Sequence, residues 1–224
     1  MIDWSPIFLT FQLAAMTTAI LFVMSLPISY WLAFSKNKFK PVIEAMISMP
    51  LVLPPTVIGF YLLIAFSPNN FFGNWVEHIL GIRLVFTFHG LVFASLIYSM
   101  PFMVYPIQSG LSNLDPKIRE ASMLLGKSDF TTFFRVLLPN IKTSVISGIV
   151  LAFAHTIGEF GIVLMIGGNI PDKTRVASIA IYDQVEMMNY SQAHIYSIIL
   201  FAFAFTILLS VYMINNGFLK KLWK

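Results

Sequence analysis

The sequence predicts an all-α, polytopic integral membrane protein with about five spanning helices. Apolar residues make up 58% of the 224 residues and charged residues only 11%, against roughly a quarter charged in a typical soluble domain. Five apolar stretches are long enough to cross a hydrocarbon core, which takes about 20 residues of helix. We therefore expect one transmembrane domain over residues 1–224. The expected spans are 7–34, 42–66, 84–108, 141–166 and 190–214.

The positions of the basic residues predict the orientation of these spans. Eleven of the fourteen lysines and arginines fall on one side of a five-span topology, and cytoplasmic loops are enriched in such residues. The amino terminus is therefore expected outside the membrane and the carboxyl terminus in the cytoplasm. The excess positive charge is attributed to topology and not to nucleic-acid binding, because no alternation of basic and aromatic residues accompanies it. The eleven residues are Lys36, Lys38, Lys40, Lys117, Arg119, Lys127, Arg135, Lys142, Lys220, Lys221 and Lys224.

The first span carries scattered polar side chains, and the start of the chain lacks the basic region of a signal peptide. We expect this span to be retained as an anchor. Hydroxyl and amide groups in a lipid-phase helix are typical of a face packed on other helices. The residues expected on that face are Gln12, Thr17, Thr18 and Ser25.

Three prolines interrupt the second span. Pro50, Pro54 and Pro55 lie within six residues, and each removes a backbone donor and clashes with the preceding turn. A broken helix is therefore expected at this point. Because irregular backbone at membrane depth survives only where it is buried in protein or lines a water-filled cavity, Pro54 and Pro55 are candidates for the wall of a translocation path.

The fourth span holds an intramembrane carboxylate. Glu159 lies in an apolar run, where a charge costs at least about 2.5–3.5 kcal/mol on insertion scales. Two interpretations remain open: an i,i+4 pair with His155 that satisfies both groups within one helix, or a gate that faces a path. Gly158 and Gly161 flank the carboxylate and permit close backbone approach.

A charged segment, residues 115–139, separates the third and fourth spans. Asp115 and Pro116 are typical of a helix start, and Gly126 is typical of a left-handed helix end. Ser128 then begins a second short helix with phenylalanines at three- and four-residue spacing, and Pro139 forces the next segment to a new angle. Two short helices with apolar stripes outside the bilayer predict a docking surface for another protein or for the membrane body.

Recognisable catalytic motifs are absent. The chain contains no cysteine and no metalloprotease, nucleophile-elbow or nucleotide-binding motif. We expect a protein that is not itself an enzyme and that holds no cofactor or metal. A stand-alone carrier or channel remains an alternative from another class, since Glu159 could relay protons.

The 115–139 segment resembles the EAA motif of ABC importer permeases. The resemblance is carried by Glu120, Ala121 and Ser122, then Gly126 after three residues, and residues 136–139 (VLLP) after nine more. Ser122 and Val136 depart from the usual alanine and isoleucine by small changes of shape. The resemblance implies a type I importer permease fold and a coupling helix that docks on a cytoplasmic ATPase. The implied docking residues are Glu120, Ala121, Gly126, Leu138 and Pro139.

Two further stretches resemble the molybdate permease subfamily, with sulfate permeases as near relatives. They are residues 50–63 (PLVLPPTVIGFYLL) and residues 157–185, which include IGEFGIVLMIGG. The resemblance implies a homodimer in the lipid of a bacterial plasma (inner) membrane, two ATPase subunits that bind ATP and magnesium, and an external molybdate-binding protein. Sulfate or tungstate is the alternative substrate. The path residues expected under this assignment are Pro54, Pro55, His155, Gly158, Glu159 and Gly161.

Overall fold

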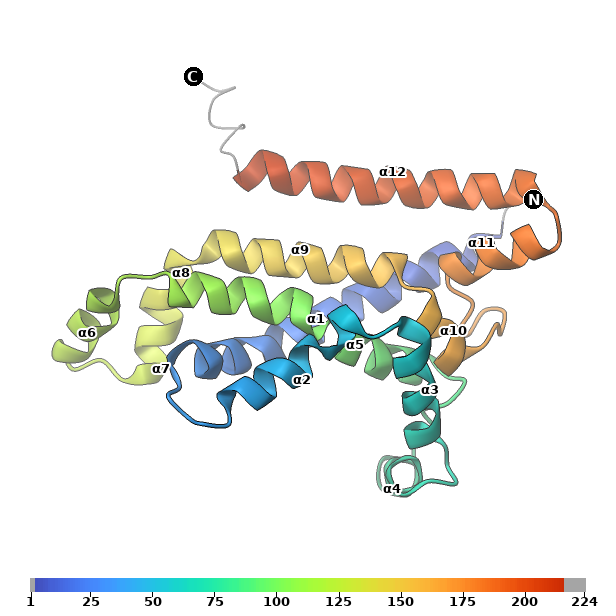
Figure 1. Cartoon of the computed structure of the whole chain (residues 1–224). Coiled ribbons are helices and arrows are strands. Elements are labelled where there is room, and N and C mark those ends of the chain that lie inside the picture. The colour runs from blue at the N-terminus through green and yellow to red at the C-terminus, as the bar shows by residue number, and fades with distance from the viewer. Residues whose placement is uncertain (1–2, 216–224) are drawn as a thin grey trace.

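The structure is a computed structural model that describes residues 3–215, which contain helices and connecting segments but no strand (Figure 1). Lys220, Lys221 and Lys224, which are expected on the cytoplasmic side, lie outside the described residues. The helices are α1 (Ser5–Phe34), α2 (Lys40–Val52), α3 (Pro55–Phe66), α4 (Phe71–Leu80), α5 (Phe88–Ser112), α6 (Pro116–Leu124), α7 (Asp129–Thr132), a π-helical turn η1 (Phe133–Leu137), α8 (Leu138–Asn140), α9 (Lys142–Gly158), α10 (Gly161–Gly167), α11 (Ala177–Glu186) and α12 (Tyr190–Asn215).

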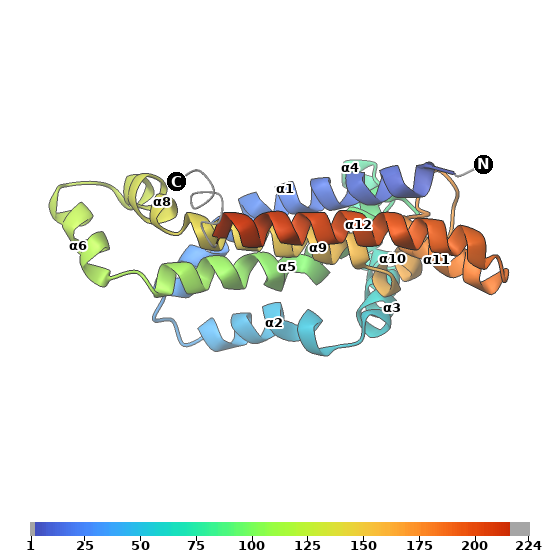
Figure 2. The same ribbon diagram turned by 90° about the horizontal axis from the view of Figure 1, so that it is seen from above.

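Helices α1, α5 and α9 run side by side and form the centre of the molecule (Figures 1 and 2). The core contains fully buried leucines such as Leu21 and Leu91. Ser29 Oγ donates to the carbonyl of Val104 at 3.0 Å and ties α1 to α5. Helix α12 packs on α9 and α11 along the outer side of the bundle.

The polar residues of α1 follow the predicted packing face with one exception. Thr17, Thr18 and Ser25 are buried, as expected for hydroxyls that face other helices. Gln12 is exposed, so its assignment to that face is wrong. Its position beside buried Leu13 shows that one step along a helix turns a side chain by about 100° onto another face.

Three helices, α1, α5 and α12, are long and apolar enough to cross a membrane, and two further pairs pass the same test if each bent pair is one span. Helices α2 and α3 are bent by 115° at Leu53 and Pro54, where the prolines predict a break. The segment Asp129–Asn140 and helix α9 are bent by 80° just after Pro139. These helices give three to five candidate spans within the described residues.

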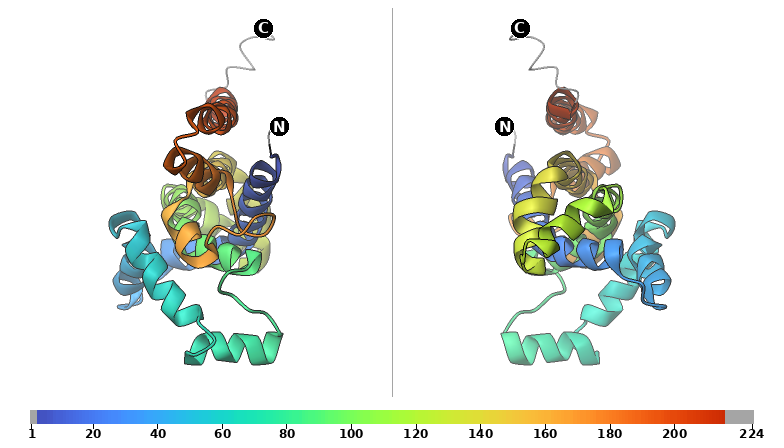
Figure 3. Two further views of the ribbon diagram at one scale, coloured as in Figure 1. Left: turned by 90° about the vertical axis from the view of Figure 1, so that its right-hand side faces the viewer. Right: turned by 90° about the vertical axis from the view of Figure 1, so that its left-hand side faces the viewer.

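The bend after α2 carries α3 and α4 away from the central bundle. Figure 3 shows them as an arm that projects from one side of the molecule. The arm packs on the bundle mainly through α3, which crosses α10. The broken second span therefore reaches the region that follows Glu159.

The fourth expected span is not one continuous helix. Helix α9 ends at Gly158, Glu159 is extended with φ −70° and ψ 132°, and α10 begins at Gly161. The expectation that Glu159 lies within a helix is therefore wrong. Gly158 and Gly161 mark the two helix ends, and the apolar pattern on both sides concealed the break.

Candidate functional site

The 115–139 segment folds as two short helical pieces joined at Gly126. The Asp115 side chain accepts from the amide of Lys117 at 2.9 Å and begins α6, and Gly126 has a left-handed φ of 73°, where a residue with a Cβ is strained. Ser128 then accepts from the amide of Thr131 and begins α7. These local signals are confirmed, and they place an elbow between the two pieces.

Polar contacts hold this elbow closed and tie it to α1. Ser122 and Thr132 share a buried hydroxyl contact of 2.8 Å across the elbow. Arg119 donates to Asp129 at 3.3 Å, and Tyr30 of α1 donates to the same oxygen at 3.2 Å. The Arg119 guanidinium also lies over the ring of Phe34, 4.7 Å from its centroid. Nothing in the sequence of α6 alone indicates that Arg119 would pair with a residue ten positions further along the chain.

The outer face of the elbow is apolar and exposed. The side chains of Leu124, Leu125 and Phe130 are 89%, 78% and 73% exposed. Glu120 and Ala121 are also exposed, and Glu120 makes no hydrogen bond or ion pair within residues 3–215. We call the exposed residues Glu120, Ala121, Met123, Leu124, Leu125 and Phe130 the elbow face. It can bind a surface that offers an apolar groove.

The last predicted residues of this segment lie at its exit. Leu138 is half-buried and Pro139 is exposed at the start of the short α8. Leu137 is buried in the core and anchors the same turn. The 80° bend follows at once, so Leu138 and Pro139 connect the elbow to α9 and do not belong to the elbow face.

A second region brings together two helix breaks that are distant in sequence. A Cβ built on Gly161 would lie 2.7 Å from the Cβ of Pro55, and one built on Gly59 would lie 2.9 Å from the Cβ of Met165. Real Cβ atoms do not approach so closely, so glycine allows α3 to cross α10 at these points. Pro55 and Gly161, predicted separately as path residues, are thus in contact, whereas a Cβ built on Gly158 would point into open space.

Glu159 caps α10 from inside the protein. Its side chain is 7% exposed, and its Oε1 accepts from the amide of Ile162 at 3.0 Å. Its own carbonyl accepts from Ser178 Oγ at 2.6 Å, which joins the break to α11. A carboxylate at a helix start stabilises the unpaired amides and the positive end of the helix dipole.

His155 does not pair with Glu159. Its Nδ1 lies 3.0 Å from Ser99 Oγ of α5, and its ring stacks on Phe102 with centroids 4.0 Å apart. No ion pair joins His155 and Glu159 in the described part of the chain. The i,i+4 interpretation is therefore wrong, because the helix ends before Glu159 and its carboxylate turns forward to Ile162.

Known proteins resemble this chain over most of its length. Residues 25–223 match the family described as "Binding-protein-dependent transport system inner membrane component". The chain belongs to this family of permeases. It is 43% identical over 210 residues to the molybdenum transport system permease protein ModB of Azotobacter vinelandii, with 94% of this chain and 93% of the relative covered. It is 31% identical to the sulfate transport system permease protein CysT of Escherichia coli, with 80% and 64% covered.

Solved structures share the fold of the permease. The MetNI methionine ABC transporter in an inward-facing conformation matches with a TM-score of 0.73 and 14% identity, covering 95% of this chain and 94% of that chain. A bacterial ABC transporter that imports alginate matches with a TM-score of 0.77 and 15% identity, covering 95% and 78%. The type I ABC importer permease fold is thus confirmed, and the permease is a multi-pass membrane subunit of a transporter.

The cap that Glu159 forms gives a first prediction for the permease. Glu159→Gln keeps an acceptor for the amide of Ile162, so its thermal unfolding midpoint in detergent should stay near that of the wild type. Glu159→Ala removes the acceptor and should lower the stability by about 0.5–2 kcal/mol, as lost caps do. Equal midpoints for the two variants would contradict this role.

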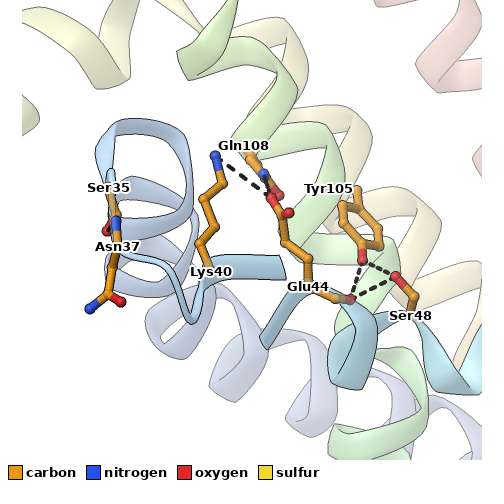
Figure 4. Close-up of polar contacts among 7 residues, drawn as sticks. All are labelled: Ser35, Asn37, Lys40, Glu44, Ser48, Tyr105 and Gln108. Atoms are coloured by element: carbon orange, nitrogen blue, oxygen red, sulfur yellow. Dashed lines mark hydrogen bonds and ion pairs between the residues drawn. The ribbon is translucent and has the colours of Figure 1, made fainter. Parts of the chain in front are cut away.

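A polar cluster that the sequence analysis missed joins α2 to α5 (Figure 4). Glu44 Oε1 accepts from Gln108 Nε2 at 2.7 Å and lies 3.8 Å from Lys40 Nζ. Tyr105 donates to the Glu44 carbonyl at 2.9 Å, and the hydroxyls of Tyr105 and Ser48 are also in contact. The sequence offers one signal for this cluster, because an isolated Gln108 in an apolar span needs a polar partner.

Removing Gln108 from this cluster should destabilise the permease. Gln108→Ala leaves the half-buried Glu44 carboxylate with Lys40 alone, and a hydrogen bond to a charged group contributes about 1.5–3 kcal/mol. We expect a loss of about 1–2 kcal/mol in a chemical denaturation series. The control is Asn113→Ala, whose amide makes only an exposed contact with Ser109, and a similar loss in both variants would refute the role of the cluster.

Proposed function

We propose that this permease is the transmembrane subunit of an ATP-driven importer of molybdate. The elbow face is the observation that carries the proposal. An importer whose permease has no nucleotide-binding motif needs a separate ATPase, and the elbow face is an exposed apolar surface on which such a subunit can dock. Two relatives support the substrate: the molybdenum transport system permease protein ModB of Azotobacter vinelandii, 43% identical, and the putative molybdenum transport system permease protein YvgM of Bacillus subtilis, 31% identical.

The proposed assembly contains two copies of this chain, two cytoplasmic ATPase subunits and one external binding protein. The ATPases bind ATP and magnesium and hydrolyse the nucleotide, so the permease needs no cofactor of its own. The elbow face docks in a groove of each ATPase. Two observations support this arrangement. The chain belongs to the family of binding-protein-dependent transport system inner membrane components, and the side chains of Leu124 and Leu125 are exposed.

The proposed orientation puts the amino terminus outside and the elbow in the cytoplasm. Its support is the positive-inside distribution of lysine and arginine. Lys117, Arg119 and Lys127 lie on or beside the elbow, whereas Lys173 and Arg175 lie at the opposite end of the bundle, next to α11. Under this orientation α4 and α11 are external.

The proposed path runs along the region where the two helix breaks meet. Pro54, Pro55 and Gly161 form the crossing of α3 and α10. Gly158 and His155 lie on an adjoining open face of α9. Glu159 holds the start of α10 in place by accepting a hydrogen bond from the amide of Ile162. Movement of the elbow reaches this region through α9, because the 80° bend after Pro139 joins the two directly.

Purification and transport test the proposal. The permease expressed with its native partners should retain an ATPase subunit in equal copy number, and the reconstituted complex should take up molybdate in the presence of ATP and the binding protein. Competition among molybdate, tungstate and sulfate then identifies the substrate. Preferred uptake of sulfate would favour the alternative that CysT relatives support, and uptake by this chain alone in liposomes would indicate a stand-alone carrier.

A further inference from the structure

Three hydrogen bonds in the core fix the proton position on His155. Thr156 Oγ1 donates its one proton to the carbonyl of Ala152 at 2.8 Å. In its 3.1 Å contact with Ser99, Thr156 must therefore accept, and Ser99 Oγ must donate. Because Ser99 has then used its only proton, the 3.0 Å contact between Ser99 and His155 requires Nδ1–H of the histidine as donor.

The neutral ring of His155 consequently presents Nε2 as a lone pair. A neutral imidazole carries one N–H, and the hydrogen bond made by one nitrogen determines the role of the other. Nε2 has no hydrogen-bond partner among residues 3–215. Because His155 donates this hydrogen bond to Ser99, the two residues do not form a catalytic dyad, in which the histidine would have to accept the proton of the serine.

His155 lies on a face of α9 that is open in the protomer. Leu151 is 42% exposed and Gly158 is exposed, one turn to each side of the half-buried His155. Ser147 lies two turns earlier on the same side of α9 and is half-buried, whereas Ser144 lies against Gly110 of α5. A face with a serine and a histidine at membrane depth is better suited to water or protein than to lipid.

Few other charged or titratable groups surround this ring. From α5, Tyr98 lies 5.1 Å away between ring centroids, and the Glu159 carboxylate is turned to Ile162. Helices α1, α5 and α12 contain no lysine or arginine within the described residues, and α9 contains only Lys142 at its start. The remaining titratable groups of these four helices bond to other residues or lie near the helix ends. Tyr30 bonds to Asp129, Tyr105 to Glu44, and Tyr196 to Asp3. The groups near the helix ends are His89, Tyr190, His194 and Tyr212.

We propose that His155 is a proton-dependent contact for the transported oxyanion. The neutral Nε2 lone pair repels an anion. When Nε2 takes a proton from water in the path, the imidazolium keeps its Nδ1–H bond to Ser99 and donates Nε2–H to an anion oxygen. An oxyanion that arrives singly protonated reaches the same complex by giving its proton to Nε2. This inference rests on the proposed function, since it requires an oxyanion to pass this face.

The test compares pH profiles of the complete transporter. Permease, ATPase and binding protein are reconstituted in liposomes, and molybdate uptake per ATP hydrolysed is measured from about pH 6 to about pH 8. Wild-type uptake should fall as the pH rises over this range, because the imidazolium form of His155 makes the contact with the anion and the neutral form does not. His155→Gln and His155→Arg, which cannot titrate there, should give flat ratios.

Ser99→Ala separates this proposal from a purely structural role. Removing the hydroxyl frees the neutral ring to carry its proton on Nε2, so uptake near pH 8 should rise relative to the wild type, whereas a structural role predicts uptake reduced equally at all pH values. Identical pH profiles for the wild type and all three variants would overturn the inference alone. Absence of oxyanion uptake by the wild-type complex would overturn the proposed function and this inference with it.

Discussion

Replacing Gly161 by valine is expected to separate α3 from α10 and to abolish transport. A Cβ at this position lies 2.7 Å from the Cβ of Pro55, and both atoms belong to short, rigid side chains. Overpacking of this kind typically costs about 1–3 kcal/mol, and valine adds two methyl groups beyond the Cβ. The thermal unfolding midpoint of the purified permease should fall, and uptake by the reconstituted complex should be lost.

Gly158→Val is the matched control for this change. Gly158 flanks Glu159 on the other side and has no heavy atom within 4 Å of a built Cβ, so the same substitution should leave membrane yield and unfolding midpoint within about 0.5 kcal/mol of the wild type. Equal loss of stability in both variants would show that the crossing of Pro55 and Gly161 is not what makes glycine necessary.

The sequence predicted the helix breaks at prolines and capping residues better than it predicted the surroundings of those breaks. Prolines and capping residues act through the backbone within a few residues, so Pro54, Asp115 and Gly126 could be read locally. The end of α9 at Glu159 was missed because valine, isoleucine and leucine continue on both sides, and an apolar pattern at membrane depth does not distinguish one long helix from two shorter ones.

The contacts of the site depend on neighbours that a single sequence does not reveal. His155 and Glu159 are four residues apart, so pairing them was the natural hypothesis, yet each bonds to a group brought by the fold: Ser99 of α5 and the amide of Ile162. The approach of Pro55 to Gly161 likewise joins positions more than one hundred residues apart in sequence. Both residues were candidates for the path, but only the tertiary structure shows that they touch.

Leu124→Asp is expected to detach the ATPase while leaving the permease folded. Leu124 is 89% exposed at the end of α6, and surface substitutions of this kind change stability by about 0.5 kcal/mol or less. An apolar anchor in a docking groove, by contrast, contributes about 2 kcal/mol or more, which corresponds to roughly thirtyfold in affinity. The ATPase should be lost during co-purification, and ATP-dependent uptake should fall with it.

Leu80→Asp supplies the same chemical change on the opposite side of the protein. Leu80 is 54% exposed at the end of α4, which the proposed orientation places outside the cell, so this variant should retain the ATPase. Glu120→Ala should weaken docking less than Leu124→Asp, because an exposed carboxylate contributes about 0–1 kcal/mol. Retention of the ATPase by Leu124→Asp at wild-type affinity would contradict docking through the elbow face.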